Sequence, residues 1–195
     1  MGGRIIVITG TPGVGKSSVS SLLASRIDSR LVSLGELARR EGLYVGYDRK
    51  RDTLVADTTK LSERVEEIAA GSEKDVIVEG HYATSVVSPQ RTHLVFVLRR
   101  DPQELVGILE GRGYKEKKVR ENVAAEILDV CLYDAVCRLG ASKVCEVDVT
   151  GRRADEVVEE IVQILSERKR CRVGLVDWLG KLEAEGKLDE YLKDF

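Results

Sequence analysis

The sequence predicts an α/β protein in which helices cover both faces of a parallel sheet. Short apolar runs alternate with amphipathic segments along most of the 195 residues, as successive strand–helix units require. Several apolar runs show no polar alternation, which is expected of strands that are buried on both faces. The first run leads directly into the glycine-rich stretch "GTPGVGKS", and a helical pattern follows it. Together these observations favour the P-loop class of nucleotide-binding folds.

Five strands and six helices are expected within one domain, because 195 residues suffice for a single complete core. The expected strands cover residues 4–9, 30–34, 75–79, 93–98 and 143–149. The expected helices cover residues 16–27, 34–42, 58–70, 101–111, 116–139 and 153–169. We assign residues 1–170 to the main domain and residues 171–195 to a C-terminal extension. The leucine spacing of the extension predicts one or two short helices packed on the domain, or alternatively a helix that binds a partner.

The composition excludes several classes of protein. A formal net charge of −2 argues against a broad nucleic-acid-binding surface. No run reaches the roughly 18–20 apolar residues of a membrane span, and the first residues do not resemble a signal peptide, so we expect a cytoplasmic protein.

Scarce Asn and Gln beside abundant charged residues are typical of heat-adapted proteins. The cysteines lack C-x-x-C or metal-ligand spacing and are expected to be reduced, mostly buried small residues; they are Cys131, Cys137, Cys145 and Cys171.

Residues 10–17 carry the phosphate-binding signature G-x-x-x-x-G-K-S. The glycines of this stretch allow the backbone to curl so that successive N–H groups surround an anion. The helix that begins near Lys16 adds its partial positive charge at the same place. Lys16 is expected to reach the β- and γ-phosphates of a nucleotide, and the hydroxyl of Ser17 is expected to ligate Mg²⁺.

The third expected strand leads from three β-branched apolar residues into Glu79, Gly80 and His81. In P-loop folds an acidic residue at the end of a neighbouring strand binds Mg²⁺, and Glu79 is the candidate for this role. His81 could face the same crevice and orient a water molecule or contact the transferred phosphoryl group; the alternative is an exposed loop histidine. Guanine-specific GTPases are excluded, because the only asparagine is Asn122 and no Asn-Lys-x-Asp motif is present.

With these residues the chain resembles the adenylate kinase isoenzyme 6 family, which comprises small nucleoside monophosphate kinases that also hydrolyse ATP and assist small-ribosomal-subunit assembly. The resemblance covers roughly residues 4–165 and rests on blocks in matching order: "TGTPGVGKSS" (9–18), "LARREGLYVGYD" (37–48), "VIVEGH" (76–81), "HLVFVLRRD" (93–101) and "LEGRGYKEKKVREN" (109–122). It implies the strand order 2-3-1-4-5, a monophosphate-binding segment at about residues 35–58 and a lid at about residues 110–120.

The resemblance also implies roles for individual residues. The ATP-binding positions correspond to Gly13, Gly15, Lys16, Ser17 and Ser18, and the lid arginine that contacts ATP corresponds to Arg112. The acceptor phosphate would be bound by Arg39, with Arg40 as the weaker candidate.

One position departs from the family pattern, and several charged residues are expected to have other locations than the nucleotide contacts described above. The family has Asp-x-His where this chain has Glu79-Gly80-His81, so we expect Glu79 to contact Mg²⁺ through water. Arg99, at the end of a strand, could point into the active site. Most lysines of the lid are expected on the solvated surface, as are Asp52 and Asp57.

The leading prediction is an ATP:AMP phosphotransferase with secondary ATPase activity, which requires ATP and Mg²⁺ and uses Lys16, His81 and Arg112 as catalytic residues. Its partners would be AMP or another nucleoside monophosphate and, by resemblance, a small-subunit ribosomal protein or a pre-ribosomal particle. One alternative is an assembly ATPase that releases a ribosomal-protein partner, with incidental kinase activity. The other is a kinase of a different small acceptor.

Overall fold

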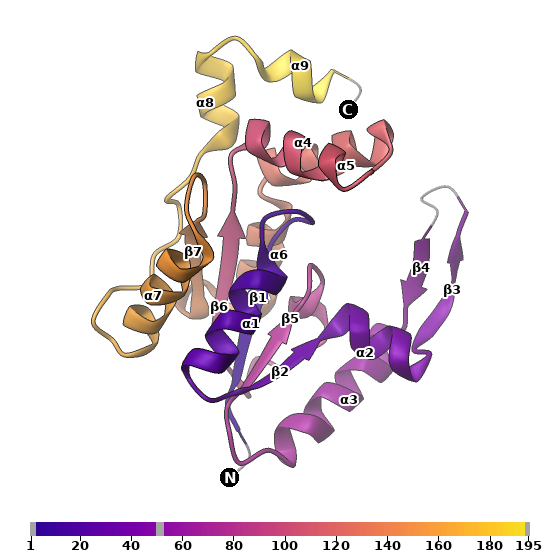
Figure 1. The fold of residues 1–195 in the computed structure, drawn as a ribbon, viewed down its shortest axis with the longest axis vertical. Helices are drawn as coiled ribbons and strands as arrows, with labels where there is room; N and C mark the ends of the chain where they lie inside the picture. Colours follow the sequence, from indigo (N-terminus) through magenta and orange to yellow (C-terminus); the bar gives the residue numbers. More distant parts are fainter. Residues whose placement is uncertain (1–2, 50–52, 194–195) are drawn as a thin grey trace.

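A computed structural model describes residues 3–49 and 53–193 and contains a five-stranded sheet in which all neighbouring strands are parallel. Across this sheet the order is β2 (Arg30–Ser33), β5 (Val76–Glu79), β1 (Ile5–Thr9), β6 (Thr92–Arg99) and β7 (Val144–Asp148), as Figure 1 shows. Counted along the chain, these strands lie in the order 2-3-1-4-5. The predicted fold class and strand order are therefore confirmed.

Helices cover both faces of the sheet, and strand β1 shows how the two cores are divided. Ile5 and Val7 pack in the cluster that contains α3 (Thr58–Ala70) and α6 (Val130–Leu139). Ile6 and Ile8 pack in the opposite cluster, with α1 (Lys16–Arg26), α4 (Pro102–Gly111) and α7 (Ala154–Leu165). All four side chains are buried. Burial on both faces explains why the strands lack polar alternation.

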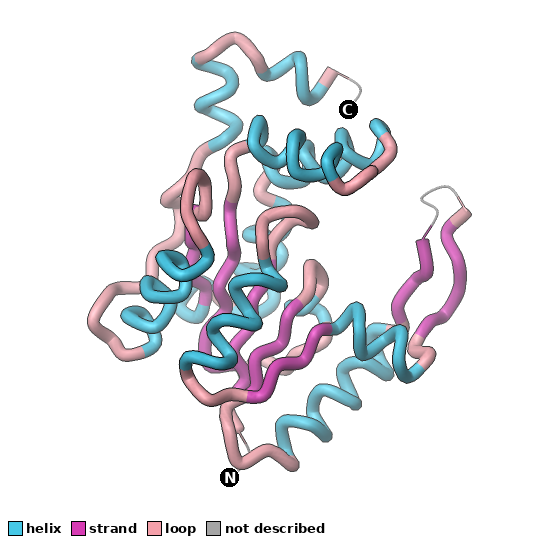
Figure 2. Tube along the Cα trace, viewed as in Figure 1, coloured by secondary structure: helices cyan, strands magenta, loops and turns pink. Residues whose placement is uncertain are grey.

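The segment after β2 contains a hairpin that the sequence did not predict. Helix α2 (Leu34–Glu41) leads into β3 (Tyr44–Asp48), which pairs antiparallel with β4 (Thr53–Ala56) before α3 begins. The hairpin extends away from the main sheet (Figures 1 and 2). Asp57, expected on the surface, caps α3 by accepting a hydrogen bond from the backbone N–H of Lys60 (3.1 Å). Asp52 lies outside the described residues.

The prediction of a single helix over residues 116–139 is wrong, because this stretch forms two helices, α5 (Glu116–Ile127) and α6. Asp129 adopts a left-handed conformation with φ 55°, which ends the helical run without a glycine or proline. Its carboxylate pairs with the guanidinium of Arg99. This tertiary contact compensates for the unfavourable backbone conformation.

The C-terminal segment follows the edge strand β7 and then covers α5. The backbone N–H of Glu146 in β7 donates to the carbonyl of Arg172 (2.8 Å), and a disulfide joins Cys145 to Cys171. The expectation that all cysteines are reduced is therefore wrong for these two. Helix α8 (Trp178–Ala184) and helix α9 (Leu188–Leu192) follow, and both pack near α5 (Figure 1). Within the described ranges, no helix has the length and apolarity needed to cross a membrane.

Candidate nucleotide-binding site

The phosphate loop, residues 10–17, joins β1 to α1 at the carboxyl edge of the sheet. Gly13 and Gly15 have φ angles of 101° and 106°, a region that L side chains rarely adopt. A Cβ atom at Gly13 would also lie 2.7 Å from Cδ1 of Leu105 in α4. Gly15 is the N-cap residue of α1, so the partial positive end of this helix faces the loop. The loop therefore has the geometry of an anion-binding site.

Lys16 is buried, and its side chain folds back over the loop. Its Nζ donates to the carbonyl oxygens of Gly10 (2.9 Å) and Thr11 (3.0 Å). Burial is the main cause that lowers the pKa of Lys16, and the nearby charge of Arg112 lowers it further. Two neutral carbonyl oxygens are weaker partners for this ammonium than phosphate oxygens would be. The ammonium is therefore expected to leave the carbonyls and bind a phosphate when one is present.

Ser17 and Glu79 converge beside the loop from two different elements. Glu79 is the last residue of β5 and is paired in register with Ile8 of β1, which places its buried carboxylate near the first turn of α1. The hydroxyl of Ser17 lies 3.5 Å from Oε1 of Glu79. No cluster of three or more acidic, His or Cys residues suited to a metal occurs in the described part of the chain. One hydroxyl and one carboxylate fit Mg²⁺, which usually takes its remaining ligands from nucleotide phosphates and water.

His81 follows β5 and is surrounded by positive charge. Burial lowers the pKa of His81 to about 4, and the charges of Lys16 and Lys118 contribute. His81 is exposed by surface area, while the protein atoms packed around its ring disfavour the charged form. The ring also makes an edge contact with Tyr82 at a centroid distance of 4.7 Å. At neutral pH the imidazole is therefore uncharged.

An NMR titration of the His93→Gln variant, in which His81 is the only histidine, should give a midpoint at about pH 4. Because the folded pKa lies below the unfolded value of about 6.5, the unfolded chain binds more protons between these pH values. The contribution of His81 to stability is therefore full above about pH 6.5 and decreases as the pH falls toward 4. Added tripolyphosphate should raise the midpoint by offsetting the charge of Lys16. A midpoint near 6.5 without phosphate would show that the ring is fully solvated.

Two cations of the predicted lid act electrostatically on residues of the candidate site. Arg112 is exposed in the turn between α4 and α5, and its charge acts on Lys16. Lys118 is one of the lid lysines, most of which were expected on the solvated surface. It is only partly exposed, its Nζ lies 5.3 Å from the ring centroid of Tyr114, and its charge lowers the pKa of His81. Lys118 therefore belongs with the positive charges that surround the site.

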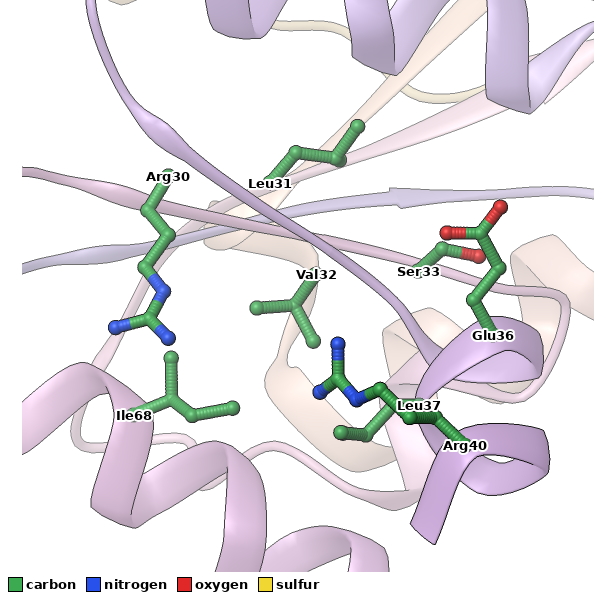
Figure 3. Close-up of a pocket in the computed structure, with 8 residues that line it drawn as sticks. All are labelled: Arg30, Leu31, Val32, Ser33, Glu36, Leu37, Arg40 and Ile68. Atoms are coloured by element: carbon green, nitrogen blue, oxygen red, sulfur yellow. The ribbon is translucent and has the colours of Figure 1, made fainter.

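The two arginines expected to bind the acceptor phosphate have different surroundings. Arg39 is exposed in the last turn of α2, and its guanidinium makes no hydrogen bond or ion pair within residues 3–49 and 53–193. Arg40 pairs with Glu41 (3.1 Å) and lines a cavity of about 90 Å³ beside the edge strand β2 (Figure 3). Ser18 is exposed on α1, one residue beyond the Ser17–Glu79 contact.

Arg99 does not point into the site, so that expectation is wrong. Its side chain is buried behind the phosphate loop, where it pairs with Glu126 (2.8 Å), Glu146 (2.5 Å) and Asp129. Burial disfavours its charge, but these carboxylates together raise the pKa of Arg99. The following residue, Arg100, lies closer to the loop: its Nη2 is 3.5 Å from the carbonyl oxygen of Val14.

Glu126 is a site-supporting residue that the sequence analysis did not identify. The hydroxyl of Thr11, in the phosphate loop, donates to its Oε2 at 2.6 Å. The available signal was that Glu126 falls on the apolar stripe of its helix with Val119, Val123 and Ile127, all of which are buried. A carboxylate in such a position requires a buried partner.

The fold and the phosphate loop define a protein of the P-loop nucleotide-binding class. A family model described as an AAA domain matches residues 6–129. A shikimate kinase from Acinetobacter baumannii, solved in complex with shikimate, superposes with a TM-score of 0.61 at 14% sequence identity, over 86% of this chain and 96% of that chain. At this identity the likeness concerns the fold.

Two relatives of similar length share much more of the sequence. A protein from Methanocaldococcus jannaschii named "Putative adenylate kinase" is 39% identical over 176 residues, which cover 90% of this chain and 93% of that protein. A protein of the same name from Methanothermobacter thermautotrophicus is 42% identical over 178 residues, covering 91% and 99%. The chain belongs to this archaeal family of proteins named as adenylate kinases.

Proposed function

We propose that this protein is an ATP-dependent nucleoside monophosphate kinase that converts ATP and AMP into two molecules of ADP. The observation that carries the proposal is the phosphate loop, in which the buried ammonium of Lys16 lies over a glycine turn at the start of α1. Ser17 and Glu79 beside the loop provide a fitting place for Mg²⁺. The names of the archaeal relatives support AMP as the acceptor.

The donor nucleotide would be held mainly by charge and backbone N–H groups. Phosphoryl transfer needs little covalent chemistry from the protein, so positioning and charge neutralisation provide most of the acceleration. Lys16 would exchange its two carbonyl partners for oxygens of the β- and γ-phosphates, and Arg112 would approach the γ-phosphate from the lid. Gly13, Gly15 and Ser18 would contact the phosphates along the loop and the first turn of α1. Mg²⁺, when bound, neutralises phosphate charge, and Ser17 and Glu79 would hold it, Glu79 through water.

The acceptor would be held by Arg39. Its guanidinium is exposed and has no partner in the described residues, so it is available for a bidentate contact with the phosphate of AMP. Closure of the lid over both nucleotides would exclude water, which otherwise competes as the acceptor.

ATP hydrolysis is proposed as a secondary activity, with His81 as the residue that orders water. The uncharged imidazole can accept a hydrogen bond from a water molecule near the γ-phosphate. A part in small-ribosomal-subunit maturation, with a ribosomal protein or a pre-ribosomal particle as partner, follows only from the resemblance to the isoenzyme 6 family and is proposed on that basis.

A coupled assay with MgATP and each nucleoside monophosphate tests the kinase proposal. We expect ADP formation to depend strongly on AMP and to yield two ADP for each ATP consumed. His81→Ala should lower the hydrolysis without AMP more than it lowers transfer to AMP, whereas His93→Ala should change neither. Equal ADP formation with and without AMP would replace the kinase by a plain ATPase. An unchanged hydrolysis rate in His81→Ala would remove His81 from the mechanism.

A further inference from the structure

A chain of buried hydrogen bonds connects the C-terminal segment to the phosphate loop. The indole N–H of Trp178 in α8 donates to Oε1 of Glu126 (3.3 Å), and the hydroxyl of Thr11 donates to Oε2 of the same carboxylate (2.6 Å). All three side chains are at most 6% exposed. We propose that Glu126 is a positioning residue for the phosphate loop and that the C-terminal segment, residues 172–193, controls it through Trp178.

Glu126 is bound from several directions at once. Besides Thr11 and Trp178, its Oε1 accepts hydrogen bonds from Nε of Arg99 (2.8 Å) and from the backbone N–H of Arg100 (3.1 Å). The partners come from the loop, from the end of β6 and from α8. A buried carboxylate with this many donors has little freedom to move, so a displacement of one partner is transmitted to the others.

The C-terminal segment is fixed to the same cluster at a second point. The backbone N–H of Leu175 donates to Oε2 of Glu146 (2.6 Å), while Oε1 of Glu146 binds Arg99 (2.5 Å). Nearby, Lys181 in α8 pairs with Asp101 at the N-terminus of α4 (2.7 Å). The segment thus contacts the ion cluster that lies directly behind the phosphate loop.

Nucleotide binding would act on this series of hydrogen bonds at Thr11, in the phosphate loop. The carbonyl of Thr11 accepts a hydrogen bond from Lys16 (3.0 Å), and its hydroxyl binds Glu126. When Lys16 exchanges this carbonyl for a phosphate, Thr11 is still restrained by its hydroxyl contact with Glu126 and by the hydrogen bond from the backbone N–H of Val14 to its carbonyl (3.3 Å). Occupancy of the loop should therefore change the surroundings of Glu126 and of the indole that contacts it.

A role limited to stability would be a simpler interpretation, since Glu126 also neutralises Arg99. However, Arg99 already has the carboxylates of Glu146 and Asp129, and neither of these contacts Thr11 among the described residues. The bond between Glu126 and Thr11 adds nothing to the pairing of Arg99. It does restrain the loop that would bind nucleotide.

Trp178 is the only tryptophan of the chain, so its fluorescence reports on this contact without labelling. Titration of the 195-residue protein with MgATP should change the emission along the same isotherm that calorimetry records. In Thr11→Val the emission change should be lost and the KM for ATP should rise about 10-fold, the effect of losing one hydrogen bond to a charged group. Thr11→Ser, which keeps the hydroxyl, should retain both the emission change and the KM.

A double-mutant cycle separates positioning from packing. Trp178→Phe keeps an aromatic ring in α8 but removes the donor, and it should raise the KM for ATP about 10-fold with a much smaller change in kcat. If the two residues act through Glu126, Thr11→Val combined with Trp178→Phe should remain near 10-fold, whereas independent effects would multiply to about 100-fold. Multiplied effects would overturn the proposal. Should Trp178→Phe fail to fold, the emission test on Thr11→Val and Thr11→Ser decides alone.

The inference depends on the proposed function only in requiring that ATP bind at the loop. Calorimetric binding of ATP without any change in Trp178 emission would overturn the inference and leave the proposed function intact. A coupled emission change in a protein that does not phosphorylate AMP would support the inference and remove the kinase. Absence of ATP binding would overturn both.

Discussion

Replacing Lys16 with Met should lower kcat for phosphoryl transfer by about 10²- to 10³-fold, because one preorganised charge in a water-poor site contributes about 3–4 kcal/mol to transition-state stabilisation. The ammonium of Lys16 is buried and already lies over the loop, within 3.0 Å of two carbonyl oxygens. Met keeps the apolar stem and the approximate length of the side chain. The charge at the phosphates is therefore the main thing removed.

The same variant should remain folded, which separates catalysis from stability. Burial lowers the pKa of Lys16, so the fold disfavours its charge, and the melting temperature of Lys16→Met should stay close to that of the parent protein. Lys60→Met in α3 is the matched control: Lys60 is exposed, and its loss should leave kcat unchanged. Initial rates under saturating ATP and AMP measure the effect. A Lys16→Met protein with nearly normal kcat would contradict the role assigned to this lysine.

Replacing Arg99 with Met should lower the free energy of unfolding by about 3–5 kcal/mol, the usual effect of removing one partner from a buried ion pair. Arg99 is 1% exposed and is bound to Glu126, Glu146 and Asp129. Without it, the carboxylates of Glu126 and Glu146 would face each other in the interior with no guanidinium between them. For a chain of this length the melting temperature should fall by roughly 6–20 °C.

Urea unfolding followed by circular dichroism measures this loss. Arg26→Met is the control, because Arg26 pairs with Glu159 on the surface, where both side chains are at least half exposed. Such a pair is worth about 0.2–1 kcal/mol. A decrease of less than about 1 kcal/mol in Arg99→Met would show that the cluster does not stabilise the fold in the manner described.

The main sheet could be predicted from the sequence because its signals are local. Strands β1 (IIVIT) and β5 (VIVE) consist almost wholly of Val and Ile and are buried throughout, and this pattern needs no knowledge of the rest of the chain. The β3–β4 hairpin gave no such signal, since Val45, Tyr47, Leu54 and Val55 are exposed and face no core. The break at Asp129 depends on a contact with Arg99, 30 residues away in the chain.

The residues of the candidate site also fall into those that a short stretch of sequence predicts and those that only the folded structure brings together. The phosphate loop is one continuous motif, and Glu79 ends the strand beside it, so both were predicted from short stretches. The contacts of Glu126 join residues that are 115 positions apart, for Thr11, and 52 apart, for Trp178. The Cys145–Cys171 disulfide likewise joins positions 26 residues apart that share no motif. Such contacts arise only when the sheet has placed the elements together.

Calorimetric titration with a two-headed analogue, in which two adenosines are joined by a chain of phosphates, would test most directly whether the loop and the α2 segment bind two nucleotides together. If the phosphate loop holds the donor while Arg39 holds the acceptor, one analogue should bind each chain about 10²-fold or more tightly than MgATP, because the second contact becomes intramolecular. Arg39→Met should abolish this gain and leave the affinity for MgATP unchanged. An analogue that binds the intact protein no more tightly than MgATP would contradict a site for two nucleotides.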